Sequence, residues 1–157
     1  MKTNIRNISR RRGLVPVAVL ALIVIAASVL ADGETHDWGL ASGLTIDVRN
    51  RLYPDFQERQ QIGMNERVQV GDTDFFFEVV DFYPHFALID STKEVVSLSH
   101  EPENVAFKFV VYENDSIIDT SWSFYNLQVP HYSRTSFLYF NVIRFIYRDE
   151  TYEKTPQ

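Results

Sequence analysis

Cysteine is absent from the 157-residue sequence, and glycine and histidine are scarce, with six and four residues. Without cysteine the chain forms no disulfide, no thiolate metal site, no haem attachment through cysteine and no cysteine nucleophile. The few glycines form neither a phosphate-binding loop nor a GxSxG nucleophile motif. A domain without disulfides must be held by its apolar core, and 12 Phe, 8 Tyr and 2 Trp, all after residue 31, supply the material.

Acidic residues are missing from the first 31 positions. Residues 1–13 carry five basic residues, and residues 14–31 carry no charge. A helix over 14–31 rises about 27 Å at roughly 1.5 Å per residue, close to a hydrocarbon thickness of about 30 Å. Because basic residues are retained in the cytoplasm, the pattern predicts a cytoplasmic basic segment at 1–13 and a transmembrane signal anchor at 14–31. The rest of the chain is expected to be extracytoplasmic (periplasmic), on a single-pass protein of the cell inner, or cytoplasmic, membrane.

A second interpretation of residues 14–31 stays open. Val29 and Ala31 are small residues at the two positions that signal peptidase reads, and cleavage after Ala31 would release a secreted domain. The apolar run is longer than the usual signal-peptide core of roughly 7–15 residues, which favours the uncleaved anchor. Both interpretations deliver the same domain to the same side of the membrane.

The part of the chain after the apolar segment is strongly acidic. Residues 32–157 hold 21 acidic and 10 basic residues, a formal net charge of −11. Such a domain repels phosphate backbones, so no nucleic acid partner is expected.

This acidic part divides into three by its pattern. Residues 32–66 are polar and weakly periodic, and they are predicted to form a stalk and the first edge elements, with a short strand at 44–48 and a short helix at 54–61. Residues 67–147 read as successive short strands and are predicted to form a β-sandwich core. Residues 148–157 are predicted to be a polar C-terminal tail.

Four stretches carry the strand pattern of this core. Residues 75–83 (FFFEVVDFY) are apolar on both faces, which is typical of a central strand covered on both sides. Residues 86–98 predict a short hairpin, residues 105–125 a longer one, and residues 137–147 the last strand. The predicted fold class is all-β, an antiparallel β-sandwich or barrel-like domain after a single N-terminal transmembrane or signal helix.

Strict alternation also assigns side chains to faces. The expected groupings are Phe75, Phe77 and Val79 against Phe76, Val80 and Phe82; Val105, Phe107, Phe109 and Val111 together; and Leu138, Phe140, Val142 and Ile146 against Tyr139, Ile143, Phe145 and Tyr147. Trp122 shares a face with Phe124 and is expected to fill the space between the sheets. Glu78 and Asp81 fall on opposite faces, which prevents them from forming a catalytic carboxylate pair.

Metal and cofactor chemistry finds little support in the sequence. The histidines, at positions 36, 85, 100 and 131, show neither an HExxH motif nor the i, i+4 spacing of a helical zinc site. His85 and His131 each follow a proline, so a two-histidine site for copper, haem or zinc is conceivable, but ordinary loop histidines are the simpler interpretation. Asp72 and Asp74 lack the glycine and the distant glutamate of an EF-hand. No catalytic, cofactor-binding or metal residue is assigned.

Two short motifs resemble a known family. Residues 99–107 (SHEPENVAF), followed by 120–124 (TSWSF), resemble the "PxNPA … W-F" pattern of extracytoplasmic β-domains that accompany the cytochrome c biogenesis protein ResB and related membrane proteins. In those domains a strand ends in a "dFyP" run, as residues 81–84 do here, and Val105 stands where the pattern prefers proline. ResB carries its haem chemistry on several transmembrane helices, whereas this sequence has one apolar segment. The resemblance implies an accessory, membrane-tethered β-domain facing the periplasm, and it transfers no catalytic residue.

Two functions follow from these patterns. The first is a membrane-anchored, non-enzymatic accessory or partner-binding domain, whose partner is an envelope or membrane protein, in cytochrome c biogenesis or another envelope complex. The alternative is a secreted β-sandwich that binds or hydrolyses carbohydrate or lipid. Its stacking surfaces would be Tyr125, Tyr132, Tyr139 and Tyr147. The first is favoured because the apolar segment and the acidic, β-rich body occur without any catalytic motif.

Overall fold

The computed structural model describes residues 37–126 and 137–155. The expected anchor at 14–31 and the residues His36, His131 and Tyr132 lie outside these ranges. All regular structure within them is β-strand, and the strand pairs are antiparallel, which confirms the all-β prediction. None of the described residues forms a helix long and apolar enough to cross a bilayer.

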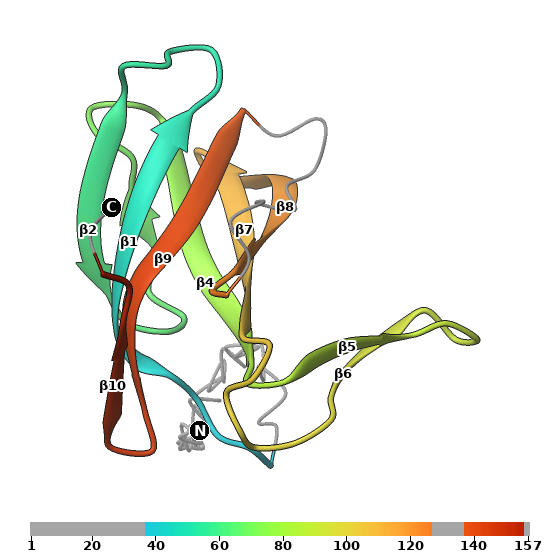
Figure 1. Cartoon of the computed structure of the whole chain (residues 1–157). Coiled ribbons are helices and arrows are strands. Elements are labelled where there is room, and N and C mark those ends of the chain that lie inside the picture. The colour runs from blue at the N-terminus through green and yellow to red at the C-terminus, as the bar shows by residue number, and fades with distance from the viewer. Residues whose placement is uncertain (1–36, 127–136, 156–157) are drawn as a thin grey trace, which may run out of the picture. The chain divides into compact units, whose positions relative to one another are not determined.

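Two four-stranded sheets and one separate hairpin make up the described part of the chain (Figure 1). The first sheet has the order β10-β9-β1-β2 and contains β1 (Ser42–Asn50), β2 (Gln57–Ile62), β9 (Leu138–Tyr147) and β10 (Glu150–Glu153). The second sheet has the order β3-β4-β7-β8 and contains β3 (Val68–Gln69), β4 (Phe75–Tyr83), β7 (Ala106–Glu113) and β8 (Ser116–Phe124). The hairpin of β5 (Phe86–Ile89) and β6 (Glu94–Ser97), as predicted for residues 86–98, forms a two-stranded sheet of its own.

The core lies between the two four-stranded sheets and is rich in phenylalanine. Phe140 of β9 stacks on Phe109 of β7 with ring centroids 4.3 Å apart, and it lies 5.0 Å from Phe77 of β4. The face predicted for the long hairpin is confirmed, because Val105, Phe107, Phe109 and Val111 are all at most 1% exposed.

The predicted stalk at 32–66 contains a central strand. β1 pairs with β2 on one side and with β9 on the other, and its residues Leu44, Ile46 and Val48 are fully buried. The alternation at 44–48 correctly predicts a strand. Its central position depends on pairing with β9, about a hundred residues away, and no local pattern reveals that.

One further local prediction is wrong, and the segment predicted to be a polar tail contains a strand. The helix expected at 54–61 is absent, because Gln57–Ile62 forms β2 and pairs with β1 over six residues. The polar C-terminal tail contains β10, which pairs with β9 across a turn at Arg148 and Asp149. Both turn residues have positive φ, 51° and 64°, as in the tight turns that connect twisted strands.

Register irregularities change two of the predicted faces. The ladder between β4 and β7 shifts between Val79 and Asp81, so Phe82 joins Phe77 in the core instead of lying opposite to it. The ladder between β1 and β9 is also irregular, and Phe145 joins Leu138, Phe140 and Val142 in the core, together with Tyr147. A bulge adds one residue to one strand and reverses the alternation beyond it.

The faces of β8 are inverted relative to the prediction for Trp122. Ser121 and Ser123 point inward and are 1% and 2% exposed, whereas Trp122 is half-buried on the outer face, beside Lys108 of β7. Serine is small enough to let the neighbouring sheet approach, and the Val142 N–H donates a hydrogen bond to Ser123 Oγ at 3.4 Å. The space beside β8 is therefore taken by the β9 backbone and not by an indole ring.

Candidate functional site

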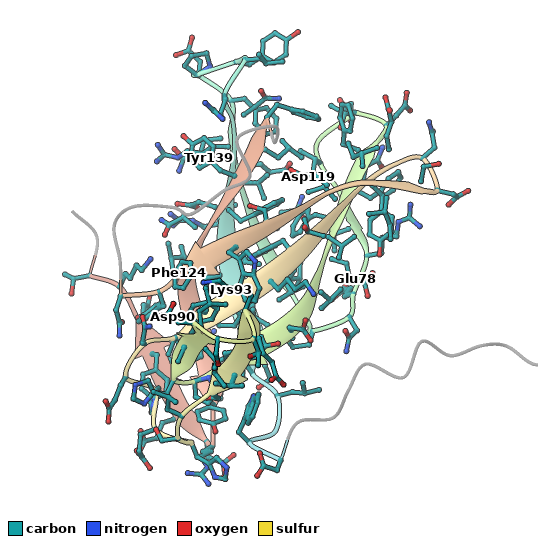
Figure 2. The ribbon with its side chains drawn as sticks, turned by 90° about the vertical axis from the view of Figure 1, so that its right-hand side faces the viewer. Glu78, Asp90, Lys93, Asp119, Phe124 and Tyr139 are labelled. Atoms are coloured by element: carbon teal, nitrogen blue, oxygen red, sulfur yellow. The ribbon has the colours of Figure 1, made fainter. Side chains whose placement is uncertain are left out.

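The hairpin of β5 and β6, called the arm below, extends away from the two larger sheets (Figure 1), and Figure 2 views it from its tip, where Asp90 and Lys93 lie. Lys93 has φ +60° in the turn and lies 3.7 Å from Asp90. The arm exposes large apolar side chains: Leu88 is 49% exposed, Ile89 39% and the adjacent Leu98 65%. An isolated two-stranded hairpin is marginally stable in water, so the arm needs support at its base.

A second aromatic cluster on the outer face of the second sheet supplies that support. This outer cluster consists of Trp38, Tyr83, Phe86, Val95, Ala106, Trp122 and Phe124. Phe86 of the arm packs edge-on against Phe124 at 4.9 Å and against Trp122 at 5.3 Å. Val95 of the opposite arm strand packs against the same cluster. The arm is therefore fastened at its base by rings and is exposed toward its tip.

Hydrogen bonds fix the base of the arm as well. The Phe86 N–H donates to the Asn104 carbonyl, and the Asn104 side-chain amide donates to the Phe86 carbonyl, each at 2.9 Å. The His85 N–H donates to Ser97 Oγ at 2.9 Å, and this hydroxyl donates to the Ser99 carbonyl at 2.9 Å. The loop that follows the arm thus holds both of its strands.

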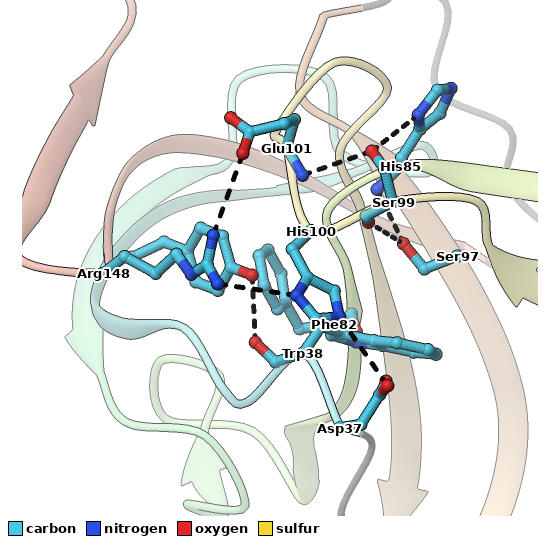
Figure 3. Close-up of polar contacts among 10 residues, drawn as sticks. Asp37, Trp38, Phe82, His85, Ser97, Ser99, His100, Glu101 and Arg148 are labelled. Atoms are coloured by element: carbon cyan, nitrogen blue, oxygen red, sulfur yellow. Dashed lines mark hydrogen bonds and ion pairs between the residues drawn. The ribbon is translucent and has the colours of Figure 1, made fainter.

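The N-terminal end of the described chain meets the domain beside the base of the arm (Figure 3). The Trp38 indole donates to the Phe82 carbonyl at 2.8 Å, and the Tyr147 hydroxyl donates to the Trp38 carbonyl at 2.9 Å. Trp38 also contacts Tyr83 of the outer cluster, with ring centroids 5.7 Å apart. Because Trp38 bonds to both large sheets and contacts the outer cluster, the place where the chain enters the domain is fixed.

His85 does not form the relay of a serine hydrolase. Its Nδ1 lies 3.1 Å from Ser99 Oγ (Figure 3). The same nitrogen lies 3.8 Å from the Glu103 carboxylate. A catalytic triad needs one ring nitrogen for the nucleophile and the other for the acid. Here both contacts fall on the same nitrogen, so the arrangement holds a loop and does not activate a serine.

His100 belongs to a neighbouring group of charged and polar surface side chains. Its Nε2 lies 3.7 Å from Asp37, its Nδ1 lies 3.5 Å from an Arg148 nitrogen, and Arg148 reaches Glu101 at 3.8 Å (Figure 3). Exposed pairs of this kind contribute about 0–1 kcal/mol each, but together they link the loop to the β9–β10 turn. The described residues contain no group of three His, Asp or Glu side chains that could hold a metal ion. His131, the other member of the conceivable two-histidine site, lies outside those residues.

Glu78 and Asp81 share the outer face of β4, contrary to the prediction of opposite faces, because the register shift lies between them. Each carboxylate meets a partner on β7: the Tyr112 hydroxyl donates to Glu78 at 2.9 Å, and Lys108 Nζ donates to Asp81 at 3.3 Å. Burial, and then the bond to Glu78, raise the pKa of Tyr112. The two carboxylates therefore stabilise the outer face of the sheet, each with its own partner.

A polar network lies on the first sheet, and the sequence gives no sign of it. Asp47 is 5% exposed and accepts two bonds from Arg59, at 2.7 and 3.0 Å, and one from Gln57 at 3.3 Å. Nearby, Lys154 donates to Asn141 at 2.7 Å, and burial lowers the pKa of its amine. Asp47 is paired with residues of the neighbouring strand β2, and Lys154 reaches β9 from just after β10. The sequence offers no motif that links these groups. The network reads as part of the fold.

Of the four tyrosines expected to form a ligand platform, Tyr132 lies outside the described residues, and the other three do not assemble into one. Tyr147 is 2% exposed in the core, and Tyr125 packs edge-on against Phe145 with centroids 5.0 Å apart. Tyr139 lies at the opposite end of β9 from Tyr147. The described tyrosines therefore favour no carbohydrate or lipid site.

Comparison with protein-family models, with curated proteins and with solved structures gave no match. A function must therefore be argued from the sequence and from the geometry described above. In that geometry the arm stands out, because it adds no strand to either large sheet.

Proposed function

We propose that this chain is a membrane-anchored extracytoplasmic β-domain that binds a partner protein and carries out no chemistry itself. Residues 14–31 anchor it in the inner membrane with residues 32–157 in the periplasm. If signal peptidase cleaves after Ala31, the same domain is secreted. The observation that carries the proposal is the arm, which exposes Leu88 and Ile89 on a hairpin that contributes no strand to either large sheet.

The construction of the arm suits a binding element. A hairpin that served only to connect β4 to β7 would not need two exposed leucines and an isoleucine, whose burial in a partner would contribute roughly 25 cal/mol per Å² of apolar surface. Its base is held by Phe86 and Asn104, so little ordering remains to be done on binding.

The resemblance to ResB-associated domains supports a setting in cytochrome c biogenesis or a related envelope complex. Asn104 lies within residues 99–107, and Trp122 and Phe124 lie within residues 120–124. All three residues contact the base of the arm. The motifs of the resemblance thus coincide with the support of the proposed binding element, and the partner is expected to be an envelope or membrane protein.

The test is the size of the native complex. Membranes that contain the full-length chain at its natural level are solubilised gently and separated on a native gel. We expect the chain to run well above its own 18.3 kDa plus detergent. Ile89→Ser should release it from the complex, because that side chain is 39% exposed on the arm.

Ile118→Ser is the matched control, because Ile118 is 42% exposed on β8, away from the arm. It should leave the complex intact. A wild-type chain that runs alone in the gel, or a complex that loses the chain equally with both variants, contradicts the proposed function.

A further inference from the structure

The two edges of the arm are not equally open. The N–H and the carbonyl of Phe86 are both hydrogen-bonded to Asn104, so these two groups point away from β6. Ladder bonds alternate along an antiparallel pair, and Phe86 pairs with Ser97 and Leu88 with Val95. The backbone groups of Leu88 on β5, and of Val95 and Ser97 on β6, therefore also point outward.

Asn104 covers the β5 edge at the base of the arm, whereas no described strand pairs with the outer edge of β6. The β6 edge thus offers outward backbone groups at two alternate positions, Val95 and Ser97. Partner proteins commonly use such an edge by adding an extended strand to it. The aromatic base holds β6 in strand geometry beforehand, which lowers the entropic cost of strand addition.

The charge around the arm selects among possible occupants. Residues 85–104 contain four acidic residues and one lysine, and that lysine, Lys93, lies 3.7 Å from Asp90. A second copy of the chain would bring a like charge of −11 in residues 32–157, and anionic lipid would also be repelled. A basic segment would be attracted.

We infer that the β6 edge accepts an extended segment with alternating basic and apolar side chains, contributed by the partner protein in the same membrane. The inference rests on the proposed function and deepens it. Asp37 and Trp38, the first described residues, contact the loop that follows the arm and the cluster at its base.

Amide hydrogen exchange of the full chain in lipid nanodiscs tests this directly. The probes are three short peptides: one that alternates lysine and valine, one that alternates glutamate and valine, and a lysine–valine peptide with a central proline. We expect the first to slow exchange at Val95 and Ser97 by about tenfold at saturation, since these amides become bonded. The proline peptide should be weaker, because it lacks a donor in mid-strand.

Charge variants sharpen the test. Glu94→Lys, at the start of β6, should weaken binding of the lysine–valine peptide and strengthen binding of the glutamate–valine peptide. Glu113 is an exposed glutamate at the end of β7, and Glu113→Lys should change the binding of neither peptide.

Four results would overturn the inference: equal protection by the lysine and glutamate peptides, protection at Leu88 instead of Val95, protection by the nanodisc lipid alone, or protection that rises with chain concentration. The last two would assign the edge to lipid or to a second copy. Suppose that the native complex still depends on Ile89 but no peptide protects β6. This result would refute strand addition, and the proposal of partner binding would remain. Absence of the complex would refute the proposed function itself.

Discussion

The second sheet carries aromatic side chains on both faces, and the two faces differ in burial. On the inner face Phe77, Phe107 and Phe109 are fully buried against the first sheet. On the outer face Tyr83 and Phe124 are buried, but Trp122 is only half-buried, and among the described residues the arm and Trp38 pack over this cluster. The inner cluster stabilises the fold, whereas the outer one fastens a projecting hairpin to it.

The largest expected effect comes from the inner face. Phe107→Ala removes a fully buried ring that lies 5.2 Å from Phe82 and 5.4 Å from Phe145. Such a truncation costs about 3–5 kcal/mol, out of a typical domain stability of about 5–15 kcal/mol. Urea unfolding of the purified full chain should show it, and Phe107→Leu should lose much less. An unchanged midpoint for Phe107→Ala would contradict the assignment of this face as the core.

A smaller effect is expected from the outer face. If Trp122 lay between the sheets, its truncation to alanine would lower stability as much as Phe107→Ala. Because the ring is half-buried, Trp122→Ala should lower the free energy of unfolding by about 1–3 kcal/mol. Trp122→Phe should retain most of the ring contacts with Tyr83 and Phe86. Thermal melts of both variants check this, and a Trp122→Ala protein as unstable as Phe107→Ala would remove the distinction between the clusters.

The inward serines of β8 provide a matched pair. Ser123→Ala removes the acceptor of the Val142 N–H and should cost about 1 kcal/mol. Ser121 Oγ is buried and finds no partner among the described residues, so Ser121→Ala should be neutral or slightly stabilising. Urea midpoints of the two variants check the contrast, and a larger loss for Ser121→Ala would show that its hydroxyl is engaged.

The smallest effect concerns alkaline pH at β10. The bond from the Tyr152 hydroxyl to Glu150, 2.7 Å long, is the main cause that raises the pKa of Tyr152 from 10.0 to about 12. Because the folded value is the higher one, this group stabilises the fold fully below pH 10. That contribution is lost as pH rises from 10 to about 12.

Tyrosinate absorbance should show a late-titrating group that is missing in Tyr152→Phe and titrates earlier in Glu150→Gln. Stability of Tyr152→Phe should fall less over this pH range than that of wild type. Identical titration curves for all three proteins would exclude the bond.

Local patterns in the sequence predict the strands but not their neighbours. The runs at 75–83 and 105–125 show their strands, and even the polar β8 is correctly predicted as the return of a hairpin. Pairing of β1 with β9 and the register shift after Val79 depend on distant partners, so the central place of β1 and the core position of Phe82 are not visible in the sequence. The same limit applies to the arm. Its hairpin is predictable, but its separation from both large sheets is not.

The face predicted for Trp122 is wrong for a related reason. Burying the largest ring between the sheets is the natural expectation from hydrophobicity alone. The structure puts serines there because β9 approaches β8 closely, and the ring goes to the arm.

The most direct test of the two-cluster account is residue-resolved hydrogen exchange of the full chain with Trp122→Ala. We expect the amides of Ala87 and Val96, which pair across the arm, to exchange at least about tenfold faster than in wild type, while those of Phe107 and Phe109 keep their rates. Uniform acceleration across the arm and β7 would show that Trp122 belongs to the same cooperative unit as the core. That result would contradict an arm fastened independently on the outer face.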